Sequence, residues 1–356
     1  MKNFKINKNF LGKNYPVYFI ADIAANHDGD LDRAKKLIEI AKENGADAVK
    51  FQHHDVRHYV NDHGFKSLGK KFSHQEKWKK TIYEVYKDAE VSTKWTTELK
   101  ELADKIEIDF FSTPYDLNMV DHLDKYVPAY KIGSGDLNWD KMLVKVASKK
   151  KPVFIATGAS TDKEVLHAYK ILLKERVPFC IMQCNTNYTG SIENFKYINL
   201  NVLKNYKKKF PKCLIGLSDH TPDSETVLGA IPLGIKSVEK HFTDDNDRDG
   251  PDHPFSMNPK SWRQMIISSR RLESALGDGN KKIEDNEKDT VVLQRRSIRA
   301  KRNIKKGEII KLADFEFQRP CPQDALKLND FDKYLGKKIK INLPKDEYLK
   351  YEFFKK

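Results

Sequence analysis

The sequence predicts an α/β protein that forms a (β/α)8 TIM barrel followed by a small β-rich domain. Eight short apolar runs alternate with helix-like segments along most of the chain, which is typical of parallel α/β folds. No glycine-rich dinucleotide fingerprint follows the first run, so a doubly wound open sheet is the weaker alternative. Beyond a polar segment, short runs separated by turns indicate a second domain.

The predicted strands and helices follow a lead-in of residues 1–16. The first helix has the clearest signals, because Asp30 is a good N-cap, apolar residues recur at helical spacing and Gly45 ends it. After the second strand we expect an irregular stretch and helical patterns through about residue 106. Strands are expected at 17–25, 47–52, 109–114, 129–135, 152–158, 179–185, 213–219 and 237–243, and helices at 31–44, 116–125, 140–150, 163–174, 202–209, 224–233 and 260–276.

The polar segment 277–289 marks the boundary between the two predicted domains. We assign residues 1–280 to the barrel, 281–289 to the linker and 290–356 to the small domain. In the last part, turn sequences such as KKG and PKD separate the short runs, as in a β-rich fold.

Composition narrows the class of protein. Hydrophobic residues make up 39% of the 356 residues, enough for a sizeable core, and the formal net charge is +14. The lysines are spread along the chain, which argues against nucleic-acid binding and leaves a few for an anionic small molecule. The four cysteines lack metal-finger spacing, and no apolar run is long enough to span a bilayer. We therefore expect a cytoplasmic protein that binds no membrane.

Two histidines, His220 and His241, each follow a short apolar run where a strand would end. Neighbouring strand ends of one barrel would bring them together, and paired imidazoles beside carboxylates can hold a divalent metal or do acid–base work. Alternatively, each histidine only satisfies hydrogen bonds at its strand end. The nearby Asp219, Asp252 and Gly-Pro turn favour a site.

Polar side chains also gather at the ends of the other predicted strands, where a barrel builds its active site. Lys50 and Lys131, with hydroxyls and GSG-type backbone donors, would cradle phosphate and carboxylate, although either lysine could instead pair with a barrel carboxylate. Asp22 lies inside an apolar run, where a carboxylate is costly without a partner. The candidates are Asp22, Asn26, His27, Lys50, Gln52, Ser112, Thr113, Lys131, Ser134, Asp136, Thr157, Thr186, Asn187, Tyr188, Ser218, Asp219, His220, Glu239, Lys240 and His241.

The ordered motifs IADIAANHDGDLDRAKKLI, AVKFQ, FFSTP, YKIGSGD, ATG, GLSDHT, EKHFT and GPDH resemble those of the sialic acid synthase family. Near the C-terminus, RRSIRAKRNIKKGEII and FEFQRP resemble that family's antifreeze-protein-like (SAF) domain. The resemblance implies condensation of phosphoenolpyruvate with an aldose, commonly N-acetylmannosamine or a related amino sugar, to a 2-keto-3-deoxy sugar acid, with phosphate released by C–O cleavage. It also implies a divalent metal, usually Mn2+ with Mg2+ or Co2+ as alternatives, and a domain-swapped homodimer.

The resemblance also assigns roles to residues of this chain. His220 and His241 match the metal ligands, and Asp252 matches an acidic residue near metal and sugar. Asp22 or Asp252 would handle protons, while Lys50 and Lys131 would neutralise phosphate and carboxylate. The phosphoenolpyruvate contacts match Lys50, Thr113, Lys131, Ser134 and Ser218, and the sugar contacts match Tyr188, with Thr186 or Asn187 in a further polar role. Arg319 matches an arginine that reaches the partner subunit's site and contacts the sugar's acyl group.

Several positions depart from the family pattern. Asp22 replaces the usual glutamate, Ala156 the usual serine, and Cys321 the glycine usual after Arg-Pro. The segment CNTNY after the sixth strand also differs. Most of these changes fall where the sugar would bind, so the identity of the aldose stays open, whereas the reaction class is less affected.

Two other functions compete with the synthase. A metal-dependent barrel hydrolase would use the same histidines, but it needs more metal ligands than the sequence offers and has no use for the two strand-end lysines. A catalytically inactive carbohydrate-binding or scaffold protein is supported only by the changes at Asp22 and Ala156.

Overall fold

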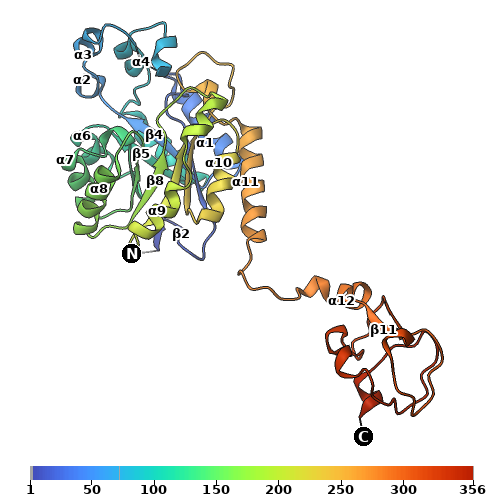
Figure 1. The fold of residues 1–356 in the computed structure, drawn as a ribbon. Helices are drawn as coiled ribbons and strands as arrows, with labels where there is room; N and C mark the ends of the chain where they lie inside the picture. The colour runs from blue at the N-terminus through green and yellow to red at the C-terminus, as the bar shows by residue number, and fades with distance from the viewer. Residues whose placement is uncertain (1–2, 72, 356) are drawn as a thin grey trace. The chain divides into compact units, whose positions relative to one another are not determined.

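The computed structural model describes residues 3–71 and 73–355 and confirms the predicted closed barrel. Eight parallel strands pair in the order β10-β3-β4-β5-β6-β7-β8-β9 (Figure 1). Because all of them run in the same direction, their C-terminal ends form one rim. The strands are β3 (Tyr18–Asp22), β4 (Ala48–His53), β5 (Asp109–Pro114), β6 (Tyr130–Ile132), β7 (Val153–Ala156), β8 (Phe179–Cys184), β9 (Leu214–Asp219) and β10 (Ser237–His241).

Helices cover the outside of the barrel because each presents an apolar face to the strands. In α1 (Leu31–Glu43) the buried residues recur at helical spacing, and the Asp30 side chain accepts a hydrogen bond from the Arg33 backbone N–H as the N-cap. The other helices around the barrel are α5 (Trp95–Lys105), α6 (Leu117–Leu123), α7 (Asp140–Ser148), α8 (Asp162–Lys174), α9 (Val202–Lys209), α10 (Glu225–Ala230) and α11 (Pro259–Ala275). Within the described residues, no helix has the length and apolar character needed to cross a membrane.

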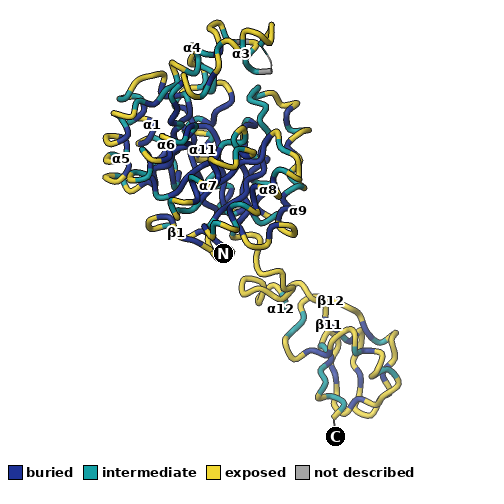
Figure 2. The backbone as a smooth tube through the Cα atoms, turned by 90° about the vertical axis from the view of Figure 1, so that its left-hand side faces the viewer, coloured by how far each residue is buried: buried dark blue, intermediate teal, exposed yellow. Residues whose placement is uncertain are grey.

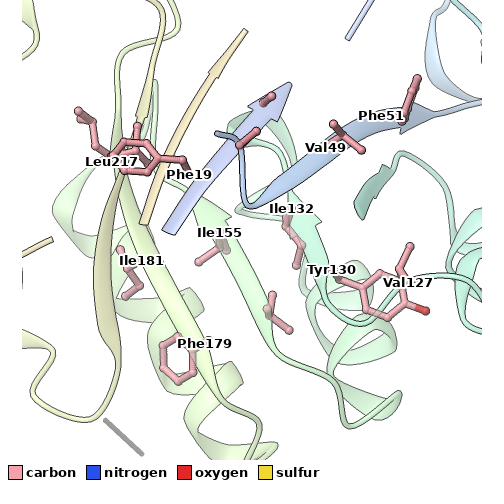
Figure 3. Packing of buried hydrophobic residues seen from close by; sticks show 14 of the residues in the cluster. Phe19, Val49, Phe51, Val127, Tyr130, Ile132, Ile155, Phe179, Ile181 and Leu217 are labelled. Carbon is pink, nitrogen blue, oxygen red and sulfur yellow. The ribbon is translucent and has the colours of Figure 1, made fainter. Parts of the chain in front are cut away.

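The main hydrophobic core lies between the strands and this layer of helices (Figure 2). Phe19, Ile155 and Leu217 are strand residues that belong to it (Figure 3). Side chains alternate along a strand, so the residues on either side of each of these face the inside of the barrel. The polar candidates near the strand ends therefore divide into an inward set and an outward set.

The predicted lead-in folds as a β-hairpin at the N-terminal end of the barrel. Strands β1 (Phe4–Ile6) and β2 (Asn9–Leu11) pair antiparallel, and their apolar side chains join those of the barrel interior in one cluster. The ring of Phe4, for example, meets that of Phe154 edge-on, with 6.0 Å between centroids. The hairpin closes the end of the barrel opposite the rim that the C-terminal ends of the strands form (Figure 1).

The stretch after β4 forms small helices at the rim end of the barrel (Figure 1). They are α2 (Val56–Tyr59), α3 (Asp62–Ser67) and α4 (Ile82–Asp88). A separate apolar cluster around Val56 and Ile82 holds them together and includes several aromatic rings. This excursion places aromatic side chains beside the open end of the barrel.

The chain divides into two compact units, residues 1–277 and 278–356. In the second unit β11 (Ser297–Ala300) and β12 (Phe315–Gln318) form a two-stranded antiparallel sheet, in agreement with the predicted β-rich domain. It has its own core, which contains Ile298, Ile304, Ile310, Phe315, Leu326, Phe331, Ile339, Leu343 and Leu349. Helix α12 (Lys288–Gln294) begins inside the segment predicted as a linker.

Candidate active site

Charged side chains fill the inside of the barrel near its C-terminal rim. Lys50 Nζ lies 2.7 Å from Asp22 Oδ2, and Lys131 Nζ lies 2.8 Å from Glu239 Oε1. Lys50 Nζ also approaches Glu239 Oε1 to 3.7 Å, which joins the two ion pairs into one network. All four side chains are at most 4% exposed. Strand register explains the first pair, because Asp22 and Lys50 are partners across β3 and β4.

The network shifts the pKa values of Glu239, Lys50 and Asp22. Burial alone would raise the pKa of Glu239, but Lys131 and Lys50 outweigh it and lower that pKa to about 2. Burial opposes the charge on Lys50, yet Asp22 and Glu239 raise the pKa of its ammonium. Burial raises the pKa of Asp22 against the pull of Lys50. Both lysines thus pair with barrel carboxylates, and such a network of buried charges at the C-terminal rim of a barrel marks a candidate site.

The predicted hydroxyls lie beside this network. Lys50 Nζ donates to Thr113 Oγ1 at 3.3 Å, and Ser218 Oγ donates to Glu239 Oε1 at 3.1 Å. Ser134 Oγ accepts a hydrogen bond from the Gly158 backbone N–H at 2.9 Å. These hydroxyls and backbone donors add uncharged hydrogen-bonding groups to the two ammonium groups, as an anion cradle requires.

His220, directly after β9, and His241, the last residue of the neighbouring β10, lie together with 5.2 Å between ring centroids. Burial, reinforced by the proximity of His241, lowers the pKa of His220 to about 3, and burial lowers that of His241 to about 4. Both imidazoles are therefore neutral at physiological pH. His220 Nδ1–H donates to the carbonyl of Asn185 at 2.8 Å, which leaves the lone pair on Nε2 for a ligand.

Carboxylates flank the histidine pair. His241 Nε2 lies 3.6 Å from Asp22 Oδ2, and His241 Nδ1 lies 3.6 Å from Asp252 Oδ2. His241 Nδ1 is buried and has no hydrogen-bond partner. Two neutral imidazoles with an unpartnered buried nitrogen fit a divalent metal. Within the described residues, however, no group of three or more His, Cys, Asp and Glu side chains forms a complete metal cage.

Aromatic residues separate the histidines from a cavity of about 1340 Å3 at the rim. Tyr188 lies 4.2 Å from His220 and Phe255 lies 4.9 Å from His241 between ring centroids, and both also line the cavity. Trp78 and Trp95 line another part of its wall. A cavity with aromatic walls and polar groups at its inner end suits a small polar molecule with apolar substituents.

The segment after β8 contributes two further predicted residues. Thr186 packs against Gly158, where an added Cβ would come within 2.4 Å of Thr186 Cγ2 and 2.9 Å of Ser134 Oγ. The side-chain oxygen of Asn187 is buried without a hydrogen-bond partner. Thr186 therefore lies next to the hydroxyl of Ser134, and Asn187 retains an unused acceptor.

Asp219, Lys240 and Arg319 are among the candidates that lie elsewhere. Asp219 points away from the barrel interior and forms a buried ion pair with Lys240, while Thr221 and Thr226 donate to the same carboxylate. This pair lies on the helix side of β9 and β10, because it alternates with Ser218 and Glu239. Arg319 belongs to the second unit, where its Nε donates to the Gln294 carbonyl at 2.6 Å.

Glu239 was among the strand-end candidates, but the sequence assigned it no role. It is the partner of Lys131 and lies within reach of Lys50. The signal was present, since Glu239 precedes His241 by two residues and must share its face of β10. Gln52 likewise reaches the site, with its Nε2 3.4 Å from Asp22 Oδ2.

Comparison with known proteins gives matches over both units. A family model described as the NeuB family matches residues 37–281, and one described as the SAF domain matches residues 295–355. These two matches agree with the resemblance seen in the sequence motifs.

Individual relatives align along nearly the whole chain. An N,N'-diacetyllegionaminic acid synthase of Campylobacter jejuni is 33% identical over 338 residues, covering 93% of this chain and 98% of that protein. The human N-acetylneuraminate-9-phosphate synthase is 32% identical over 339 residues, covering 95% and 92%. Among solved structures, an N-acetylneuraminic acid synthetase of Leptospira borgpetersenii in complex with citrate superimposes with a TM-score of 0.69 and 27% identity, covering 82% and 95%.

Proposed function

The chain belongs to the NeuB family of sialic acid synthases and related enzymes, and we propose that it condenses phosphoenolpyruvate with an acylated amino aldose. The product would be a 2-keto-3-deoxy sugar acid, released together with phosphate. The observation that carries the proposal is the position of Asp22, which contacts both Lys50 of the cationic network and His241 of the histidine pair. An anion cradle and a site for a polarised carbonyl are therefore adjacent.

Lys50 and Lys131 would bind the phosphate and carboxylate of phosphoenolpyruvate, helped by Thr113, Ser134 and Ser218. In the network each ammonium already faces a carboxylate. An incoming dianion would share these cations, so part of its binding energy would go into displacing Asp22 and Glu239 from them. Holding the two substrates in place lowers the entropic part of the barrier.

His220 and His241 would hold a divalent metal, which we propose to be Mn2+, with water or substrate oxygens in the remaining positions. When bound, the metal supplies a Lewis acid that polarises the aldehyde of the sugar. The neutral state of both imidazoles favours this role, because a ligand nitrogen needs its lone pair.

The condensation needs proton transfers, which we assign to two carboxylates. Carbon 3 of phosphoenolpyruvate attacks the aldehyde carbon, whose oxygen takes up a proton as the C–C bond forms. Water then adds to the cationic carbon 2 and loses a proton, which gives a tetrahedral intermediate. The hydroxyl of this intermediate loses the second proton as the C=O bond forms, and the bond between carbon 2 and the bridging phosphate oxygen breaks. Asp252, beside His241, would give the proton to the sugar's oxygen, while Asp22, whose pKa burial raises, would take the proton from water.

The aldose would occupy the rim cavity, with Tyr188 and Thr186 or Asn187 as contacts. We propose that Arg319 reaches the site of the partner subunit in a domain-swapped homodimer and contacts the sugar's acyl group. Asp22 and Ala156 stand where the family usually has longer or more polar side chains. Ala156 is buried at the end of β7, so the lost hydroxyl removes one hydrogen-bonding group from the cradle.

The test measures phosphate release with Mn2+, phosphoenolpyruvate and a panel of N-acylated amino aldoses, with mass spectrometry of the product. We expect release only with an accepted aldose. Phosphoenolpyruvate labelled with 18O at the bridging position should place the label in phosphate, because the C–O bond breaks.

Other outcomes point to other functions. Phosphate release without any aldose would indicate a phosphatase or hydrolase. No turnover with any sugar by a folded, metal-loaded protein would refute the synthase and favour a non-catalytic carbohydrate-binding role.

A further inference from the structure

The loop that follows β10 is tied at three points to the chain that follows β3, namely to Arg33 in the first turn of α1 and to Asp28 in the loop before that helix. Near its start, Arg33 Nη1 donates to Asp244 Oδ2 at 3.1 Å. In its middle, Arg248 Nε and Nη2 donate to Asp28 Oδ2 at 2.9 and 2.7 Å. At its end, His253 Nε2 lies 2.8 Å from Asp28 Oδ1. Strands β10 and β3 are neighbours in the barrel, so the two loops leave the rim side by side.

His253 is the most constrained residue of this contact. Its ring is fully buried, and Nδ1 lies 2.7 Å from Thr243 Oγ1 while Nε2 faces Asp28. Its carbonyl accepts a hydrogen bond from Asn246 Nδ2 at 2.8 Å. Gly250 passes directly over the ring, because a Cβ at that position would lie 2.6 Å from His253 Cδ2. The ring is held at both nitrogens and covered by backbone, which fixes the peptide next to it.

Asp252 is the residue next to it. Its Oδ2 lies 3.6 Å from His241 Nδ1 and accepts a hydrogen bond from the Ala25 backbone N–H at 3.1 Å. Its carbonyl accepts from Ser256 Oγ at 2.7 Å. A loop separates Asp252 from β10, so the place of its carboxylate depends on how the loop is anchored rather than on the strand. A reacting group displaced by a fraction of an ångström loses much of its effect.

Building on the proposed function, we propose that Asp28 and His253 are positioning residues that hold the Asp252 carboxylate toward His241 and the sugar. Neither side chain needs to touch substrate in this role. Asp28 binds the middle and the end of the loop at once, so one carboxylate sets the position of the whole segment before Asp252. This would assign a catalytic purpose to a polar cluster around the buried His253, outside the cationic network.

The experiment is a double-mutant cycle between His253→Phe and Asp252→Asn in the full-length, metal-loaded protein. Each single variant should lower kcat by about 10-fold to 100-fold, with KM for phosphoenolpyruvate changed less than about 2-fold. In the Asp252→Asn background, His253→Phe should cost less than about 3-fold, because the group it positions is already missing. Asp28→Asn, combined with Asp252→Asn, should show the same non-additive losses. It replaces His253→Phe in the experiment if the His253→Phe variant does not fold.

A control and a rescue separate positioning from general stability. Thr226→Val removes a buried hydrogen bond to Asp219 on the helix side of the barrel, away from this loop. The fold-change in kcat that it causes should be the same in the natural protein and in the Asp252→Asn background, because the two sites are independent. His253→Gln, whose amide can still reach Asp28, should recover activity to within about 5-fold of the natural protein.

Two results would overturn the inference: losses that multiply fully in the His253→Phe and Asp252→Asn cycle, or an Asp252→Asn variant with unchanged kcat. Both require that the natural protein turns over. If the natural protein condenses no aldose with phosphoenolpyruvate, the proposed function itself fails, and the two failures are thereby distinguished.

Discussion

Replacing Lys131 by Met should destabilise the barrel by at least about 3 kcal/mol at pH 7. Methionine keeps an unbranched apolar chain but removes the ammonium that lies 2.8 Å from Glu239 Oε1. With an effective dielectric of about 20, that pair attracts by about 6 kcal/mol before desolvation is counted. The net value is smaller: lowering the pKa of Glu239 from its usual value of about 4.3 to about 2 corresponds to about 3 kcal/mol.

The dependence on pH gives this prediction a second signature. In the natural protein the folded-state pKa of Glu239 is lowered, so the stabilisation is present above about pH 4.3 and is lost as pH falls toward about 2. Without Lys131, burial should raise that pKa above its unfolded value, and the variant should lose stability as pH rises. Protonating Glu239 limits this additional loss to about 4 kcal/mol at pH 7 and to about 1 kcal/mol at pH 5, on top of the roughly 3 kcal/mol that the lowered pKa contributes in the natural protein.

Urea unfolding at pH 7 and pH 5, followed by tryptophan fluorescence, measures both quantities. All four tryptophans lie in residues 1–277, so the signal reports on the barrel unit. Lys131→Met/Glu239→Gln should regain most of the stability but little activity, because the charge is no longer buried alone while the cradle remains incomplete. A Lys131→Met variant as stable as the natural protein at pH 7, or equally destabilised at both pH values, would refute the reasoning.

Three further predictions address the metal, the sugar and the hairpin. His220→Ala and His241→Ala should each weaken Mn2+ binding by at least about 10-fold to 100-fold in calorimetry, and near-normal affinity in either variant would contradict the assignment. Arg319→Ala should raise KM for the aldose about 10-fold without changing KM for phosphoenolpyruvate, since a charged hydrogen bond to the sugar is lost; an unchanged sugar KM would count against the swapped arrangement. Ile6→Ala should cost about 2–5 kcal/mol in urea unfolding, because the side chain is fully buried in the barrel interior, and a loss below about 1 kcal/mol would show that the hairpin is dispensable.

Local patterns were sufficient for the regular elements of the barrel. The strand Asp109–Pro114 and the helix Val202–Lys209 have the predicted bounds, because the strand is a short, continuously buried run and the helix buries Leu203 and Tyr206 at helical spacing. The hairpin of residues 4–11 was predicted as a lead-in, since strands of three residues are too short to show alternation. Helix α12 has no fully buried residue, so it lacked the apolar stripe that would have distinguished it from a linker.

The sequence by itself determined which chemical groups stand at the strand ends, because strand length and alternation are local properties. It could not decide which carboxylate neutralises which lysine. Lys131 and Glu239 are 108 residues apart, and in the closed barrel the other strand-end carboxylate, Asp219, pairs with Lys240 instead. Only the closed barrel sets these pairings. An unpaired buried charge is too costly, so each lysine pairs with the carboxylate that lies on the same side of the strands.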